Sequence, residues 1–296
     1  MKALKVLSLF DGISCARVAL ERAGIEVDTY YASEVDKYAM QISNKNYPDI
    51  VQLGSVTEVG EVSDSKDKRH YFSQGNIDLL IGGSPCQNLS MAGNGTGLDG
   101  EESKLFFEYV RILKEVKPKY FILENVGSMK NENRDKISEF IGIKPIMIDA
   151  KLVSAQDRKR YFWTNIPNVT LPEDRGTLLK DILEPRERAT DITERMNKKV
   201  IGTLAHKKTW SSIRTPEQKS KTLTAAGQGI ANSGATNIKV NDRYYQLTPT
   251  ECERLQGLED NYTEGVSNSQ RYKMLGNAFN VDVVAHILSF IPICKS

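Results

Sequence analysis

Short apolar runs that alternate with amphipathic segments predict an α/β fold. Residues 5–10, 27–33, 77–81 and 120–123 are mostly apolar and are followed by Asp-Gly, Glu, Gly-Gly and Glu-Asn. Such runs are typical of buried strands in a parallel sheet. Residues 104–116 carry an apolar stripe with helical spacing, which predicts a helix that packs on this sheet. Strands that alternate with helical segments indicate strand–helix–strand units.

The turn after the first strand and the acid after the second outline a nucleotide-binding unit. Residues 11–15 form a turn of small and polar residues before a predicted helix, and Glu34 follows the second strand. In such units the turn lies at a helix N-terminus and the acid holds ribose hydroxyls. The dinucleotide fingerprint GxGxxG is absent. A solvated surface role for Glu34 is the alternative, because glutamate is mostly exposed.

The third strand ends in Gly82-Gly83-Ser84-Pro85-Cys86-Gln87, which predicts a sharp, exposed turn that carries one thiol. A thiol at such a place is positioned to attack a substrate, although many cysteines are simply small buried hydrophobes. Glu124 follows the next strand, and the carboxyl ends of parallel strands share one edge, so we expect Cys86 and Glu124 to face one cleft. The glycine-rich segment 88–103 is either a loop that closes over a substrate or an ordinary connector.

Later segments predict a basic lobe and a returning helix. Residues 156–163 suit a strand with Gln156, Arg158 and Arg160 on one face, or else a charged edge strand. Residues 168–245 are polar and basic, which predicts a small lobe with a phosphate-contacting surface. Thr248 and Glu251 form a predicted capping box, and 281–291 predicts a final apolar helix that packs back on the α/β domain.

Composition narrows the class of protein. The chain has 296 residues and a net charge of +2, which neither requires nor excludes a nucleic-acid partner. Its four cysteines form no CxxC pair and its three histidines are scattered, so we expect reduced thiols and no metal site. We see no transmembrane window and no signal peptide. These features predict a cytoplasmic protein with one large domain and a smaller one.

Six motifs in a fixed order resemble the DNA cytosine-5 methyltransferase family. Two positions have the residues usual in bacterial and phage enzymes, namely Cys86-Gln87 and Gln156. Two other stretches resemble the de novo-type catalytic domain, namely Ala32-Ser33-Glu34-Val35 and Arg160-Tyr161-Phe162-Trp163. The motifs are Phe10-Asp11-Gly12-Ile13-Ser14, Gly82 to Gln87, Glu124-Asn125-Val126, Gln156-x-Arg158-x-Arg160, Leu247-Thr248-Pro249-x-Glu251-Cys252-x-Arg254-Leu255-Gln256-Gly257 and Gly276-Asn277-Ala278-Phe279.

The resemblance implies covalent catalysis on a flipped-out cytosine of duplex DNA. Cys86 would add to carbon 6, so that carbon 5 attacks an electrophilic methyl group. Glu124 would hydrogen-bond ring nitrogen 3 and the exocyclic amine, and Arg160 the carbonyl oxygen. Arg158 and Arg160 would give the thiolate electropositive surroundings.

The family also implies S-adenosylmethionine as methyl donor, in a Rossmann-like sheet with helices on both faces. The family usually has an aspartate where Ser55 stands, so either Ser55 accepts weakly from the adenine or Asp49 takes this place. The implied cofactor residues are Phe10, Asp11, Gly12, Ile13, Glu34, Val35, Ser55, Val56, Pro85, Leu105, Asn277 and Ala278.

By the same resemblance, 1–167 is the catalytic and cofactor-binding domain, 168–245 a small irregular target-recognition lobe, and 246–296 a segment that packs back on the catalytic domain. The expected enzyme is a monomer that can have a cognate restriction endonuclease as partner, and its de novo-like features favour a CG-containing site. Expected DNA contacts are Gln87, Ser90, Arg214, Lys219, Lys221, Thr222, Thr224 and Gln228.

Two alternatives compete with this interpretation. One is a tRNA cytosine-5 methyltransferase of the related family, whose characteristic Cys-Phe-Thr segment is not visible here. The other is a catalytically silent DNA-binding regulator, which usually lacks the nucleophile or the acid, whereas Cys86, Glu124 and Arg160 are all present.

Overall fold

The chain forms two compact units, each assembled from separate stretches of sequence. The computed structural model describes residues 3–60, 70–72, 74–84, 103–194, 213–227 and 235–292. Unit 1 comprises Met1–Ile148, Lys159–Leu171 and Val283–Ser296, and unit 2 comprises Asp149–Arg158 and Pro172–Asp282. The chain therefore changes unit four times.

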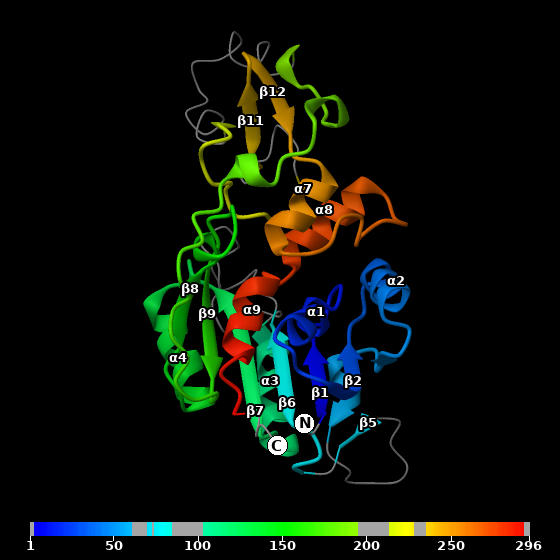
Figure 1. The fold of residues 1–296 in the computed structure, drawn as a ribbon. Coiled ribbons are helices and arrows are strands. Elements are labelled where there is room, and N and C mark those ends of the chain that lie inside the picture. Colours follow the sequence, from blue (N-terminus) through cyan, green and yellow to red (C-terminus); the bar gives the residue numbers. More distant parts are fainter. Residues whose placement is uncertain are drawn as a thin grey trace. The chain divides into compact units, whose positions relative to one another are not determined.

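Unit 1 is built on a seven-stranded sheet (Figure 1). Its strands are β1 (Leu4–Leu9), β2 (Val27–Ser33), β3 (Val51–Gln52), β6 (Leu79–Gly83), β7 (Tyr120–Val126), β8 (Ile146–Asp149) and β9 (Lys159–Thr164). Their order is β3-β2-β1-β6-β7-β9-β8. The first five strands of this order are parallel to their neighbours, whereas β9 runs antiparallel to β7. The apolar runs in the sequence thus form adjacent strands, and the predicted α/β fold is confirmed.

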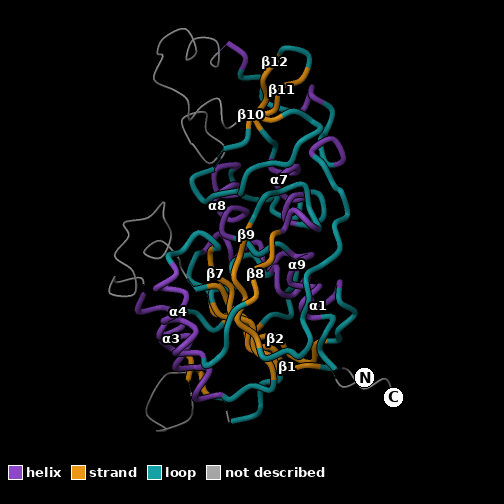
Figure 2. Tube along the Cα trace, turned by 90° about the vertical axis from the view of Figure 1, so that its left-hand side faces the viewer, coloured by secondary structure: helices purple, strands orange, loops and turns teal. Residues whose placement is uncertain are grey.

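Helices cover both faces of this sheet, as predicted. They are α1 (Cys15–Arg22), α2 (Lys37–Asn46), α3 (Ser103–Val116), α4 (Asn131–Ile141) and α9 (Val281–Leu288). Figure 2 shows α3 and α4 on one side of the sheet and α1 and α9 on the other. A short 3₁₀ helix, η1 (Val56–Glu58), and a two-stranded sheet of β4 (Val59–Gly60) and β5 (His70–Tyr71) complete the described part of this unit.

The apolar stripe of α3 is buried against the sheet, which confirms the predicted amphipathic helix. Phe106 and Tyr109 are completely buried and belong to the main core cluster. Tyr109 donates its hydroxyl to the carbonyl of Ile122 at 3.0 Å. The glycine at position 82 permits this packing, since a Cβ there would lie 2.9 Å from the carbonyl oxygen of Leu9 and 3.1 Å from the Tyr109 ring. Close packing of this kind fixes the end of β6, the strand that leads to Cys86.

Unit 2 is more irregular and is held together by short elements. A three-stranded sheet contains β10 (Ile213–Arg214), β11 (Asn237–Val240) and β12 (Arg243–Gln246). The helices are α7 (Pro249–Gln256) and α8 (Asn268–Asn277), with the 3₁₀ turns η3 (Ala150–Leu152), η4 (Leu179–Asp181) and η5 (Arg186–Arg188). The predicted capping box is confirmed, because Thr248 and Glu251 cap each other's backbone at the start of α7. Gly257 ends that helix in the left-handed conformation.

The predicted strand over residues 156–163 is wrong in its first half. Strand β9 begins at Lys159, and Gln156 forms an isolated bridge with Ser220. The backbone amide of Arg158 donates to Oδ1 of Asp149 at 3.0 Å. These local partners keep Gln156 and Arg158 out of the sheet, so only Arg160 of the three polar residues lies in the strand.

The structural division follows different boundaries from the predicted partition at residues 167 and 245. Helices α7 and α8 belong to unit 2, and so does the segment Asp149–Arg158, whereas residues from Val283 onward belong to unit 1. Composition marks where the chain becomes polar and basic, but compactness is set by contacts between segments that are distant in sequence.

Candidate active site

The carboxyl ends of β6 and β7 bring the turn before Cys86 next to Glu124. In the parallel register of these strands, Gly83 is paired with Glu124, and Gly83 is the last residue of β6. Open α/β sheets bind their ligands at this edge. The predicted site residues Pro85, Cys86, Gln87 and Ser90 and the glycine-rich segment 88–102 lie outside the described residues.

Glu124 is held in an ion pair with Arg160. Nε of Arg160 lies 2.7 Å from Oε1 of Glu124, and the two side chains are 14% and 13% exposed. Val126 is paired with Arg160 in the antiparallel register of β7 and β9, so Glu124 and Arg160 are diagonal neighbours on one face of the sheet. Gly127 allows the close approach of the two chains here, since a Cβ would lie 2.8 Å from Cβ of Lys159. The result is a carboxylate in a fixed orientation at the ligand-binding edge.

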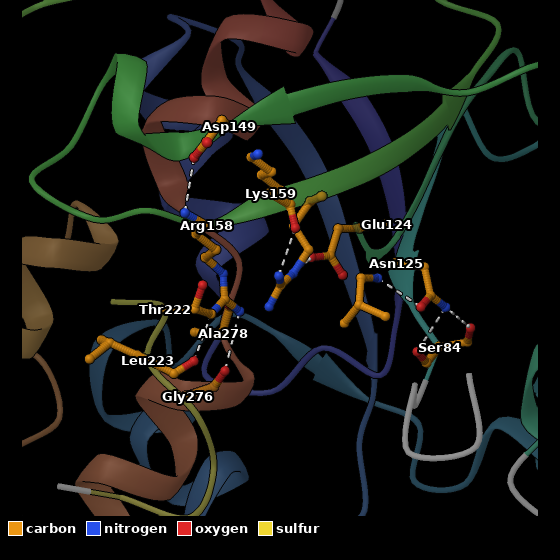
Figure 3. Close-up of polar contacts among 12 residues, drawn as sticks. Ser84, Glu124, Asn125, Asp149, Arg158, Lys159, Thr222, Leu223, Gly276 and Ala278 are labelled. Atoms are coloured by element: carbon orange, nitrogen blue, oxygen red, sulfur yellow. Dashed lines mark hydrogen bonds and ion pairs between the residues drawn. The ribbon is translucent and has the colours of Figure 1, made fainter. Parts of the chain in front are cut away.

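Asn125 ties this edge to the turn before Cys86 (Figure 3). Its side-chain Nδ2 donates to Oγ of Ser84 at 3.2 Å and to the Ser84 carbonyl at 3.5 Å. Its Oδ1 accepts from the amide of Val126 at 2.8 Å, and the residue is 1% exposed. Asn125 was part of a recognised motif without an assigned role. Its buried amide fixes the backbone two residues before the thiol.

Arg158 has different surroundings from Arg160. It lies in unit 2, is 3% exposed, and donates from its guanidinium to three backbone carbonyls (Figure 3). Nη1 reaches Leu223 at 3.0 Å, and Nη2 reaches Gly276 at 3.2 Å and Ala278 at 2.8 Å. Arg158 and Arg160 alternate in the sequence and so look equivalent, but their side chains contact different segments.

The turn after β1 and the acid after β2 are joined by hydrogen bonds. Phe10 and Gly12 both have a left-handed backbone, with φ of 56° and 61°. Glu34 accepts from the amide of Gly12 at 2.8 Å, from Val35 at 2.7 Å and from Asp36 at 2.8 Å. A carboxylate has capacity for about four hydrogen bonds, so these three leave room for a ligand hydroxyl. A Cβ on Gly12 would meet no atom within 4 Å, which leaves open space beside the turn.

Asp11 points beneath this turn rather than outward. The hydroxyls of Ser14 and Tyr30 donate to its two carboxylate oxygens, each at 2.6 Å, and the residue is 6% exposed. Burial, with a smaller contribution from the charge of Glu34, raises the pKa of Asp11 to about 6 against the lowering effect of the hydrogen bonds from Ser14 and Tyr30. Asp11 therefore supports the turn from inside the fold.

We expect Asp11→Asn to remove a pH dependence of stability. Because the pKa of Asp11 is higher in the folded chain than in the unfolded chain, its favourable contribution is present below pH 4 and is lost as pH rises through about 6. The free energy of unfolding of the natural chain minus that of the variant should fall by roughly 1 kcal/mol between pH 5 and pH 8. Urea denaturation of both proteins at each pH measures this difference. A constant difference across that range would contradict the shifted pKa.

The remaining predicted cofactor residues differ in accessibility. Val35 is exposed, and Ile13 and Val56 are buried apolar residues whose side chains pack in the core. Leu105 is partly buried against the same core cluster as Val56. In unit 2, Asn277 is exposed and Ala278 is buried.

Two candidates for the adenine contact have partners of their own. Oγ of Ser55 accepts from the amide of Thr57 at 3.3 Å, at the start of η1. Asp49 lies 3.7 Å from Arg17 in an exposed ion pair. Ser55 is partly buried and follows β3, whereas Asp49 is exposed and precedes that strand.

The predicted DNA contacts in unit 2 differ in their surroundings. Arg214 and Lys221 are partly buried, and the pKa of Lys221 is lowered, first by burial and then by the charge of Arg214. Two neighbouring cations of this kind suit a phosphate group. Thr222 donates its hydroxyl to the carbonyl of Asp157, Thr224 is partly buried, and Gln228 lies outside the described residues.

Lys219 has a structural role instead of the predicted phosphate contact. Its ammonium group donates to the carbonyls of Lys151 at 2.7 Å, Ser154 at 3.1 Å and Thr177 at 2.7 Å. An ammonium group has three donors, and all three are used within unit 2. This role could not be predicted, because backbone carbonyls have no signature in side-chain composition.

Two further findings concern only the residues that the structure describes. Among them, no group of His, Cys, Asp and Glu side chains is arranged to hold a metal ion. No helix in these ranges combines the length and the apolar character needed to cross a membrane.

The chain resembles known proteins in sequence. The family model described as C-5 cytosine-specific DNA methylase matches residues 4–292. The chain is 28% identical over 321 residues to Type II methyltransferase M.HhaI of Haemophilus parahaemolyticus, covering 97% of this chain and 94% of the relative. It is 39% identical over 134 residues to the orphan methyltransferase M.Rho11sI of Bacillus phage rho11s, covering 45% of this chain and 25% of the relative.

Solved structures share the fold along nearly the whole chain. The Entamoeba histolytica methyltransferase EhMeth superposes with a TM-score of 0.75 at 18% identity and covers 98% of both chains. The S. pombe Dnmt2 methyltransferase gives a TM-score of 0.71 at 19% identity and covers 97% of both chains.

Proposed function

Because the chain belongs to the C-5 cytosine-specific DNA methylase family, and thus methylates carbon 5 of cytosine in DNA with S-adenosylmethionine as donor, we propose that Cys86, Glu124 and Arg160 carry out the reaction. The observation that supports this most directly is the arrangement at the sheet edge. Glu124 is paired with Gly83 at the end of the strand that leads to Cys86, and its carboxylate is oriented by Arg160.

The chemistry accounts for each residue type. Carbon 5 of cytosine is a poor nucleophile. Addition of the Cys86 thiolate to carbon 6 makes carbon 5 electron-rich. Bound S-adenosylmethionine supplies the electrophilic methyl group. When carbon 5 takes up this methyl group, the proton on carbon 5 must then be lost, and the electrons of that bond expel the Cys86 thiolate and restore the ring. The target atoms are inaccessible in a duplex, so the cytosine must be flipped out.

Glu124 and Arg160 would bind the polar edge of that cytosine. A proton shared between Glu124 and ring nitrogen 3 neutralises the negative charge that addition of the thiolate develops on the ring, and Glu124 also accepts from the exocyclic amine. Arg160 has donors in a rigid fork, so the same guanidinium that holds Oε1 of Glu124 also serves the carbonyl oxygen of the base. The ion pair thus presents an acceptor and a donor together.

The cofactor residues of unit 1 fit the methyl donor. Glu34 has hydrogen-bonding capacity for ribose hydroxyls at the carboxyl end of β2, and the open turn at Gly12 lets a ligand approach the backbone. Phe10 borders the adenine, and Asp11 holds the turn from beneath. Pro85 and Leu105 complete the proposed set in this unit, and Asn277 and Ala278 are the proposed cofactor residues of unit 2.

Asn125→Ala should slow catalysis while cofactor binding is kept. Loss of the amide frees Ser84 and so misplaces the backbone before Cys86, and we expect a fall in the single-turnover rate of about tenfold. The dissociation constant for S-adenosylhomocysteine should change less than twofold, because the hydrogen bonds of Asn125 go to Ser84 and Val126, which are not among the proposed cofactor residues. Rapid-quench methylation assays and calorimetric titration measure the two quantities. An unchanged rate would remove Asn125 from the positioning role.

Duplex DNA is the substrate, and its target sequence can be found directly. Bisulfite sequencing of DNA from a methylation-deficient host that expresses the chain should reveal methylated cytosines in one sequence context. Purified protein should label duplex oligonucleotides of that context with tritiated methyl groups. Labelling of tRNA without labelling of the duplex would favour the tRNA methyltransferase alternative.

We propose that the protein is a monomer, which sedimentation analysis tests. The relatives in bacteria and phage are consistent with either a restriction partner or an orphan enzyme.

A further inference from the structure

Arg158 joins two segments of unit 2 that are far apart in the sequence. One is the turn Thr222-Leu223-Thr224, which contains proposed DNA contacts, and the other is Gly276-Asn277-Ala278, which contains proposed cofactor contacts. The guanidinium donates to Leu223 on the first segment and to Gly276 and Ala278 on the second (Figure 3). Arg158 is 3% exposed, so these hydrogen bonds are shielded from water.

The two segments also touch through their backbones. A Cβ on Gly276 would lie 2.1 Å from the carbonyl carbon of Thr224 and 2.4 Å from the amide nitrogen of Ala225. Such distances exclude any side chain at position 276 unless one backbone moves away. The turn and the end of α8 therefore pack without an intervening side chain, and a displacement of either is transmitted to the other.

Leu223, at the middle of the turn, is hydrogen-bonded through both its backbone amide and its backbone carbonyl. Its amide donates to Oε1 of Gln156 at 2.9 Å, while its carbonyl accepts from Arg158. Nε2 of Gln156 donates to Leu255 at 3.2 Å, and Gln256 donates to Leu275 at 2.6 Å. A buried network of this kind is cooperative, because each group needs its partner to stay satisfied.

We propose that Arg158 is a positioning residue that couples the Thr222–Thr224 turn to the Gly276–Ala278 segment, so that cofactor binding strengthens DNA binding and the reverse. This inference rests on the proposed function, which assigns DNA to the turn and cofactor to the segment. By thermodynamic linkage, the factor by which the cofactor strengthens DNA binding equals the factor by which DNA strengthens cofactor binding. Arg158 acts through the two backbones and does not touch the base, in contrast to Arg160.

The test compares Arg158→Lys with Arg271→Lys in the full chain. Lysine keeps the charge but lacks the planar fork, so it can serve only one of the two segments. Arg271 is the matched control because it is a buried arginine of the same unit, bound to Glu253 at 2.8 Å and Thr263 at 2.9 Å. Arg271 lies on α8, but its partners Glu253 and Thr263 belong to neither of the two segments.

The measurement is the dissociation constant of a fluorescent duplex with and without S-adenosylhomocysteine. The duplex carries the cytosine context that bisulfite sequencing identifies. We expect the cofactor product to strengthen binding at least about fivefold for the natural chain and for Arg271→Lys, and less than twofold for Arg158→Lys. Equal strengthening in all three proteins, or none in the natural chain, would overturn the coupling.

A second measurement needs no variant. Hydrogen exchange of the peptide that contains residues 222–224 should slow when S-adenosylhomocysteine is added to the natural chain without DNA. Unchanged exchange would also overturn the proposal. Absence of cytosine methylation in any sequence context would instead contradict the proposed function itself, so the two failures are distinguishable.

Discussion

Replacing Cys86 by alanine is expected to lower methyl transfer by at least about 1,000-fold, because the thiolate proposed to add to carbon 6 of the cytosine is lost. Binding of duplex DNA should remain within about threefold of the natural chain, since the thiol contributes to the reaction rather than to recognition. Incorporation of tritiated methyl groups and fluorescence anisotropy give the two numbers on the same preparation.

Cys15→Ala is the control for this change. Cys15 is buried at the start of α1, where a cysteine packs as a small hydrophobe, so its replacement should leave the rate within about twofold. Mass spectrometry with a 5-fluorocytosine duplex adds a direct check, because an irreversible complex should form with the natural chain and with Cys15→Ala. A stable complex with Cys86→Ala would place the nucleophile elsewhere.

Glu124→Gln is expected to lower the single-turnover rate by about 100-fold or more. The amide preserves the shape of the side chain, and its oxygen can still accept from Arg160, so the folded structure should persist. The amide cannot supply the proton that neutralises the negative charge developing at ring nitrogen 3. Thermal melting confirms the fold, and rapid-quench methylation gives the rate.

Asp78→Asn is the matched control for Glu124→Gln. Asp78 directly precedes β6 and accepts from the amide of Lys5 at 3.0 Å, at the opposite end of the strand from Gly83. The same change of acid to amide there should leave the rate within about twofold. A near-natural rate for Glu124→Gln would remove Glu124 from the catalytic role, whereas equal losses in both variants would point to a general effect on the sheet.

Local pattern was enough to predict the sheet and the place of the acid. The apolar runs ended at residues that the backbone places side by side, and the pairing of Gly83 with Glu124 follows from two parallel strands of similar length. Thr248 and Glu251 were identifiable because a capping box involves only neighbouring residues. Such features need no information about distant parts of the chain.

Roles that depend on distant backbone groups could not be predicted. Arg158 and Arg160 alternate in the sequence as if on one strand face, but the acceptors of Arg158 are separated from it by 65 to 120 residues. Lys219 looked like a phosphate ligand for the same reason, since its three carbonyl acceptors leave no trace in composition. Asp11 looked like a cofactor ligand, and its burial depends on Ser14 and on Tyr30 of the next strand.

The alternation of the chain between its two units constrains how such an enzyme can acquire a new specificity. Unit 2 draws on Asp149–Arg158 as well as Pro172–Asp282, so a gene exchange that replaces only residues 168–245 brings in a foreign Leu223 opposite the resident Gln156 and Arg158. Recombinants of that kind inherit the turn without the matching side chains of Gln156 and Arg158 that hold it. Exchanges that carry both segments should give functional hybrids far more often.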